Sequence, residues 1–236
     1  GVENREILLR QFGQAKKATE KPWCALALGL LARGHAHRAA QHGEAVTIDR
    51  LVGQTLYDAL QESKSPDLCG ALAVSLGLAR FTDAQEWIRD MLGATLGQPE
   101  LGGHLCISLA LLEDRRSLAA LREVARNATR QPELLRQVAI AIGHIGDIAA
   151  ASDLHDMLAR DETNVVTLGA IASALAFVGD RRSIDPLVRL LSDDQASRLA
   201  RAFAAVALGG IADKEVVPWS TKISCGINYR ASTETL

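Results

Sequence analysis

Aromatic residues make up only 4% of this 236-residue sequence, and their scarcity limits the kinds of core that it can build. The hydrophobic fraction is nevertheless 48%, supplied mainly by Ala, Leu, Ile and Val. Small and aliphatic side chains suit closely packed helices better than sheets, which favour β-branched and aromatic residues. The composition therefore favours an all-α fold.

Three further absences narrow the class of function. The net charge is −2, without the excess of Lys and Arg that a nucleic-acid-binding surface usually carries, so nucleic acid is disfavoured as a partner. The longest apolar run, residues 23–32, is about half the ~20 residues needed to span a bilayer, so no membrane span is expected. No C-x-x-C pair occurs, and unpaired core thiols indicate a reducing, cytoplasmic compartment. The four scattered cysteines are Cys24, Cys69, Cys106 and Cys225.

The sequence does contain a repeat with a fixed period of 33 residues. An earlier copy of the repeat, at Leu28, precedes Leu76 by 48 residues, which is one period plus an insertion of 15. A period between about 20 and 50 residues indicates a stack of supersecondary units that pack on their neighbours. The residues that mark the regular period are Leu76, Leu109, Ile142, Leu175 and Leu208.

Each repeat contains the signals of two helices. Asp114 is a predicted helix N-cap, and apolar residues follow it at helical spacing. Pro132 opens a second apolar-periodic stretch, and Gly146 is its predicted C-terminal cap. Because Asp recurs at this position of the repeat, capping explains these carboxylates better than catalysis does. The recurring residues are Asp114, Asp147, Asp180 and Asp213.

The second helices also carry small residues at matching positions. Small side chains allow neighbouring helices to approach to the short end of the roughly 8–10 Å interaxial range. We therefore predict that two ladders of small residues are buried between the repeats. They are Cys106, Ala139, Ala172 and Ala205, and Ser108, Ala141, Ala174 and Ala207.

These patterns predict a right-handed α-solenoid of about six antiparallel helix pairs over residues 1–217. Residues 218–236 are expected to form a non-helical cap over the last unit, and a free binding arm is the alternative. The insertion, at about 35–47, holds three histidines that we interpret as solvated loop residues rather than metal ligands. The predicted units lie at about 1–34, 47–81, 82–113, 114–146, 147–179 and 180–212.

The pattern L-R-x-V-A-x-A-I-G-x-I-G-D-x-x-A at residues 135–150 has weaker copies at 168–184 and 200–216. It resembles a HEAT repeat, in particular the short variety also found in phycobilisome lyase subunits, over about 28–216. The T-P-L-H run of ankyrin repeats and the Trp and Tyr positions of tetratricopeptide repeats are missing. Deoxyhypusine hydroxylases, which are HEAT-repeat enzymes, carry His-Glu dipeptides as iron ligands, and this sequence has none.

No sequence signature of catalysis is present: no Gly-rich phosphate loop, no G-x-S-x-G and no H-E-x-x-H. We therefore expect no metal and no cofactor, and a non-catalytic scaffold that binds another protein. The alternative is a lyase-type subunit that binds a small chromophore or cofactor on its concave face. His144 and Cys225 are the candidate reactive groups for that alternative.

In the second helices, the positions i, i+4, i+7 and i+11 lie outside the core ladders and form a stripe that we expect on the concave side. If a partner binds there, Phe177 and Phe203 are the expected anchors, with Gln137 and Arg201 at the polar rim. Ordinary inter-helix packing, or cover by the C-terminal segment, is the alternative for the same residues. The stripe reads Glu133, Gln137, Ile140 and His144, then Val166, Ala170, Ser173 and Phe177, then Leu199, Phe203, Val206 and Gly210.

Overall fold

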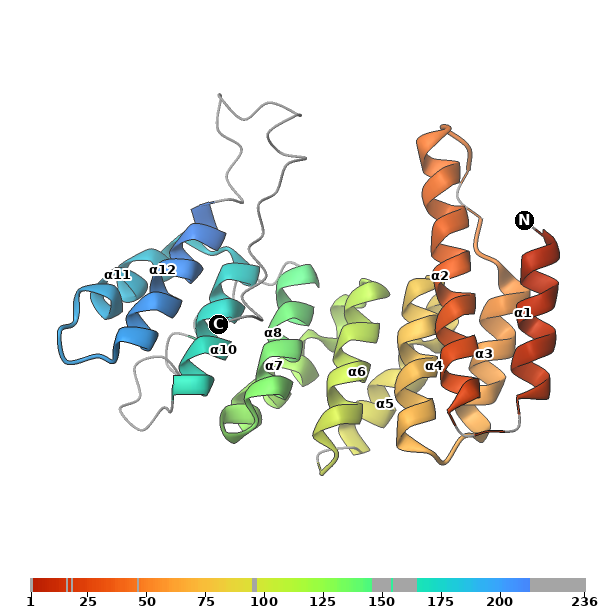
Figure 1. Cartoon of the computed structure of the whole chain (residues 1–236), viewed down its shortest axis with the longest axis horizontal. Helices are drawn as coiled ribbons and strands as arrows, with labels where there is room; N and C mark the ends of the chain where they lie inside the picture. Colours follow the sequence, from red (N-terminus) through yellow and green to blue (C-terminus); the bar gives the residue numbers. More distant parts are fainter. Residues whose placement is uncertain are drawn as a thin grey trace.

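A computed structural model describes residues 2–15, 17, 19–45, 47–94, 97–145, 154 and 165–212. In these residues the secondary structure is helical throughout, and no strand occurs among them. The helices stack side by side along one direction, as Figure 1 shows. The predicted all-α fold, built of helices packed on their neighbours, is therefore confirmed for the described part of the chain.

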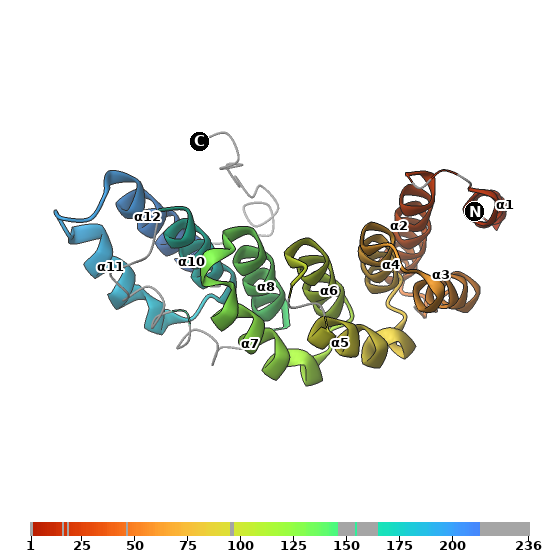
Figure 2. The ribbon, with the colours of Figure 1, turned by 90° about the horizontal axis from the view of Figure 1, so that it is seen from below.

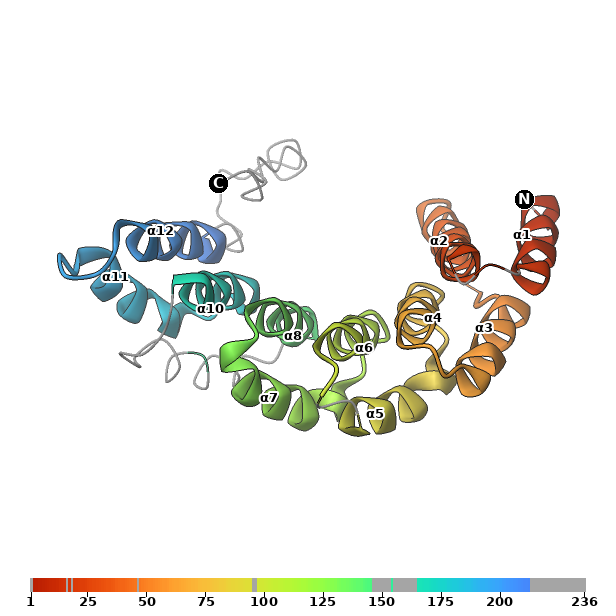
Figure 3. The same ribbon diagram turned by 60° about the horizontal axis from the view of Figure 1, so that its bottom comes forward.

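The helices form two layers around an arch. Consecutive inner helices pack on one another, and each outer helix packs on the inner helix that follows it. Figure 3 shows the outer helices along the convex edge and the inner helices along the concave edge, and Figure 2 shows the same curvature from below. The outer helices are α1 (Val2–Gln14), α3 (Arg50–Glu62), α5 (Gln85–Ala94), α7 (Leu118–Asn127) and α11 (Ile184–Ser192). The inner helices are α2 (Glu20–Gln41), α4 (Pro66–Leu78), α6 (Pro99–Leu111), α8 (Pro132–Ile145), α10 (Val165–Val178) and α12 (Arg198–Ala212).

The predicted helix-start signals have the expected structural roles. The Asp114 Oδ1 accepts a hydrogen bond from the Arg116 amide at 3.2 Å, and the Asp180 Oδ1 accepts one from the Arg182 amide at 3.0 Å. Both carboxylates cap a single 3₁₀ turn that leads into an outer helix. Capping is therefore confirmed at these two positions, whereas Asp147 and Asp213 lie outside the described residues.

Helix α2 is longer than the sequence interpretation allowed. It continues through residues 35–41, where we had expected a solvated loop, and ends just before Gly43, which has φ 69°. The segment is rich in Ala and contains no helix breaker before that glycine, so the helix propagates. In Figure 1, α2 extends beyond the ends of α4 and α6. Residues 34–41, which we call the overhang, therefore wall one end of the concave face.

The small-residue ladders are buried between the inner helices, with one exception. Ser108, Ala141, Ala174 and Ala207 are all fully buried, and the Ser108 hydroxyl donates a hydrogen bond across the interface to the Ala73 carbonyl of α4. The other ladder is buried at its first three positions but exposed at Ala205. The prediction was wrong at Ala205 because α12 is the last described inner helix and no further described helix packs on it.

The last two members of this ladder provide a matched test of close packing. Ala172→Leu should destabilise the protein by about 1–3 kcal/mol, because extra methylene groups in a packed seam force neighbouring helices apart. Ala205→Leu should change stability by less than about 0.5 kcal/mol, as surface substitutions usually do. Chemical denaturation of both variants measures the difference. Equal loss of stability in the two variants would contradict this account of the seam.

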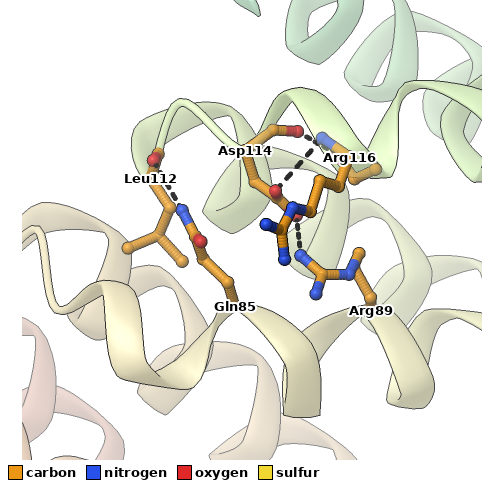
Figure 4. Close-up of polar contacts among 6 residues, drawn as sticks. Gln85, Arg89, Leu112, Asp114 and Arg116 are labelled. Atoms are coloured by element: carbon orange, nitrogen blue, oxygen red, sulfur yellow. Dashed lines mark hydrogen bonds and ion pairs between the residues drawn. The ribbon is translucent and has the colours of Figure 1, made fainter.

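A polar clamp joins the outer layer of adjacent repeats, and Figure 4 shows its side chains. The Arg89 guanidinium of α5 contacts the Asp114 carboxylate at 2.5 Å, and Asp114 is 3% exposed. Beside them, the Gln85 amide donates a hydrogen bond to the Leu112 carbonyl at 3.1 Å. Arg5 and Asp49 form a similar but longer pair, at 3.4 Å, between α1 and the start of α3. The cap of one repeat is thus also the anchor for the outer helix of the preceding repeat.

The clamp predicts strong coupling between Arg89 and Asp114. Asp114→Ala should cost about 3–5 kcal/mol, because it leaves a half-buried guanidinium without its partner. Arg89→Met keeps an apolar stem that packs similarly, so the double variant should be less destabilised than the sum of the single variants. A double-mutant cycle of unfolding free energies measures this coupling. Additive losses would mean that Asp114 acts as a cap alone.

Candidate functional site: the concave face

Three inner helices at the middle of the arch present an uninterrupted surface on its concave side. Each packs on two neighbouring inner helices and on an outer helix, so its remaining face points into the arch. Four residues per helix at the predicted stripe positions are exposed or half-buried there. We call these twelve residues the concave groove. They are Asp67, Ala71, Val74 and Leu78 of α4, Glu100, His104, Ile107 and Leu111 of α6, and Glu133, Gln137, Ile140 and His144 of α8.

The floor of the groove is apolar. Val74, Ile107 and Ile140 occupy the same position on successive helices, and each is half-buried. Leu78 and Leu111 continue this apolar surface one turn further along α4 and α6. A continuous row of half-exposed aliphatic side chains on a concave surface is suited to a partner that presents its own apolar face.

Between the apolar floor and the N-terminal ends of the inner helices, large side chains lie over glycines of the preceding inner helix. A Cβ atom added to Gly70 would lie 2.6 Å from the His104 ring, and one added to Gly169 would lie 2.8 Å from the Phe203 ring. In the same way, Gln137 covers Gly103. Phe203, Gln137 and His104 thus close the seams between helices. The signal that could have revealed this is a glycine 34 residues before each large residue.

One edge of the groove is acidic. Asp67 and Glu100 stand in the first turns of α4 and α6 and line a cavity of about 390 Å³ together with His104. Neither carboxylate has an ion-pair partner in the described part of the chain. Glu133 differs, because Arg136 binds it at 2.6 Å and this hydrogen bond lowers the pKa of the Glu133 carboxyl. The free negative charge of this edge therefore lies at Asp67 and Glu100.

The opposite edge carries basic groups. Arg33 and His37, from the last turns of α2, line a cavity of about 270 Å³ together with Arg80, Glu113 and His144. The Arg80 and Glu113 side chains form an ion pair at 2.9 Å, which leaves Arg33 as a guanidinium without an ion-pair partner among the described residues. His144, a predicted site residue, is exposed at this edge.

Arg80 and Glu113 adopt a backbone conformation that ordinarily selects glycine. Their φ angles are 55° and 53°, and Gly179, at the same position of a later repeat, has φ 69°. A non-glycine residue in this left-handed region costs of the order of 1–3 kcal/mol. Two side chains are therefore kept at this edge despite the strain, and they bind each other across the repeat boundary.

The structure places the five predicted site residues unequally. Gln137 and His144 lie on α8 within the groove, and Phe203 is half-buried on α12. Arg201 instead donates a hydrogen bond, at 3.0 Å, to the Leu191 carbonyl in the last turn of the outer helix α11. Phe177 lies in α10, and its side chain is outside the described part of the structure. The role of these residues in binding stays a prediction.

Exposed apolar residues continue the concave surface at both ends. On α12, Leu199 and Val206 are each 50% exposed. On α2, Trp23 and Leu30 are 72% and 59% exposed, and neither was a predicted site residue. Leu30 also borders a cavity of about 580 Å³ between α1 and α2. The 48-residue offset that relates Leu28 to Leu76 also relates Trp23 to Ala71 and could have identified it.

The described thiols belong to the core rather than to the groove. Cys69 and Cys106 are buried and Cys24 is half-buried, whereas Cys225 lies outside the described residues. Burial raises the pKa of the Cys106 thiol to about 12, because the uncharged form is favoured away from water. Cys106 is therefore held as the neutral thiol and is a packing residue between inner helices.

Alkylation can test this assignment. At about pH 8, iodoacetamide reacts with thiolates, so Cys106 should stay unmodified in the native protein and become modified after denaturation. Mass spectrometry of the digested protein locates the label, with Cys24 as the partly accessible internal reference. Labelling of native Cys106 at the rate of Cys24 would show that the seam between α4, α6 and α8 opens readily.

Comparison with known proteins identifies a matching family model and a similar solved structure. Residues 128–209 match the family model of HEAT repeats, which supports a HEAT-repeat protein. No curated protein matches the sequence. Human deoxyhypusine hydroxylase in complex with glycerol is a similar solved structure, with a TM-score of 0.33 and 17% sequence identity, covering 88% of this chain and 84% of that chain. In the described part of the chain, no helix is long and apolar enough to cross a membrane.

Proposed function

We propose that this protein is a non-catalytic interaction scaffold and that it binds another protein on its concave face. HEAT repeats generally serve as protein-interaction scaffolds, and residues 128–209 match them. The observation that carries the proposal is the continuous concave surface, with its apolar floor and exposed aliphatic residues at both ends. A contiguous apolar surface exposed on one face of a protein is typical of an interaction site.

The energetics of such a site depend on a few well-packed anchors. Half-exposed side chains such as Ile107 and Ile140 are already ordered by their helices, so little conformational entropy is lost when they bind. Phe203 supplies an aromatic edge but also packs on Gly169. Its truncation would therefore remove an inter-helix contact as well as a binding contact, so the freely exposed Val206 is the better probe.

Capture from the native lysate, with immobilised protein, tests the proposal. Val206→Asp places a charge on the concave side of α12 and should abolish capture of a specific partner, since a desolvated charge without a counter-ion opposes binding. Leu30→Asp should have the same effect if the surface extends to α2.

Val188→Asp is the matched control. Val188 is an aliphatic residue of the outer helix α11 and is 44% exposed, against 50% for Val206. The control variant should retain capture, and thermal unfolding of all three variants checks that the fold persists. Equal capture by the Val206→Asp and wild-type proteins, both folded, would refute a concave binding site.

The alternative function, a lyase-type subunit that binds a small chromophore, is supported only by the resemblance of the repeats to those of phycobilisome lyase subunits. The assignment to that short repeat subtype has the same basis. We further propose that the chain forms six helix pairs in a right-handed superhelix. We also propose that residues 218–236, which lie outside the described residues, cap the last pair.

A further inference from the structure

We propose that the segment bound by the concave groove is an amphipathic α-helix that lies along the groove. Its basic side chains would face the acidic edge, at Asp67 and Glu100, and its acidic side chains would face the basic edge, at Arg33 and His144. This inference rests on the proposed function and names the kind of partner that fits the same site.

The width of the groove suits a single helix. From the acidic edge to the basic edge, the stripe spans eleven residue steps along each inner helix, for example from Asp67 to Leu78, which corresponds to about 16 Å. An α-helix with its side chains is about 10–12 Å in diameter. One helix therefore fills the floor and leaves room at each side for a charged side chain to reach the edge.

The spacing along the groove also suits a helix. Val74, Ile107 and Ile140 recur once per inner helix, and packed helices are about 8–10 Å apart. Apolar residues seven positions apart on a partner helix are about 10.5 Å apart, so each can meet one aliphatic residue of the floor. Alternate residues of an extended strand are only about 6.7 Å apart, so they do not match the spacing of the aliphatic residues along the floor.

The edges supply complementary charge that the protein itself leaves unused. Asp67 and Glu100 are exposed, lack ion-pair partners among the described residues and border one cavity. Across the floor, the Arg33 guanidinium borders the other cavity together with two imidazoles, His37 and His144. A uniformly charged partner would meet repulsion at one edge, whereas a bipolar helix meets opposite charge at both.

The strained pair at the basic edge has a role in this arrangement. Arg80 and Glu113 keep their side chains where Gly179 stands in a later repeat, and both border the same cavity as Arg33. Because they form an ion pair with each other, the charge left for a partner at this edge is that of the Arg33 guanidinium. A guanidinium at one edge and carboxylates at the other favour one orientation of a bound bipolar helix over its reverse.

The proposal can be tested with three synthetic helical peptides of about 21 residues, which is about six turns. All carry Leu at the same heptad positions. The bipolar peptide has Lys along one flank and Glu along the other, the basic peptide has Lys on both flanks, and the acidic peptide has Glu on both. Fluorescence anisotropy at low salt should show the bipolar peptide binding about tenfold more tightly than either of the others, because several exposed ion pairs contribute together. At about 1 M salt the difference should collapse.

Charge reversal should change the ranking of the peptides within a single protein. Asp67→Lys with Glu100→Lys should make the acidic peptide the tightest binder, because both edges are then basic. The matched control reverses Glu86 and Asp185, which are also exposed acidic residues in first helical turns but belong to the outer helices α5 and α11. The control has the same net charge as the groove variant and should keep the bipolar peptide first.

Reversal at the other edge completes the test. Arg33→Glu should raise the affinity of the basic peptide relative to the bipolar one, whereas Arg10→Glu on the outer helix α1 should not. Because each result is a ranking within one protein, partial unfolding of a variant does not imitate it. A ranking that follows net charge in groove and control variants alike overturns the inference, as does the absence of binding by all three peptides. If capture still depends on Val206, the proposed function then survives while the helical partner is rejected.

Discussion

The close approach of neighbouring inner helices is the constraint on which the rest of the structure depends. Small residues with no exposed surface, such as Ala139, Ala141 and Ala174, line the seams, and nothing larger than Ser or Cys stands at these positions in the middle repeats. The buried hydrogen bond from Ser108 to Ala73 fixes one seam further, because a buried hydroxyl without a partner would be costly. On the outer side, the buried carboxylate of Asp114 holds Arg89 and caps its own repeat. The seams of the inner layer are thus set by close packing, and in the outer layer a polar contact adds to the buried apolar side chains.

Much of this fold could be predicted from the sequence because successive repeats carry the same helix-cap, helix-start and small-residue signals at the same positions. Asp114 and Asp180 were identified as caps from their recurrence, and Pro132 opens α8 as expected. Failures occurred where the repeat stops or is interrupted. Ala205 has the right position in the period but no described neighbour to cover it, and residues 35–41 continue α2 where the insertion offered no periodic pattern to read.

The candidate site was predictable in outline and not in detail. The period placed Gln137 and His144 on one face of α8, but it could not show that Arg201 donates a hydrogen bond to the last turn of the preceding outer helix. The basic edge was missed for a different reason. It joins Arg33 of α2 to His144 of α8 across more than 100 residues of sequence, and the overhang adds His37 to the same cavity. Long-range convergence of this kind arises from superhelical geometry, which a single repeat does not encode.

The division of labour between the two layers has a consequence for how such a protein changes over evolutionary time. Curvature in a stack of repeats is the sum of small rotations, one per seam. The volume of the ladder residues sets the inner spacing, and the clamp between Arg89 and Asp114 sets the outer spacing. Neither set of residues touches the face that points into the arch. Exchanging Ala for Ser or Gly in a seam can therefore alter the radius of the arch while every side chain on the concave face is kept. Shape and recognition are therefore encoded mainly at separate positions, and they meet at His104, Gln137 and Phe203, which lie over glycines in the seams.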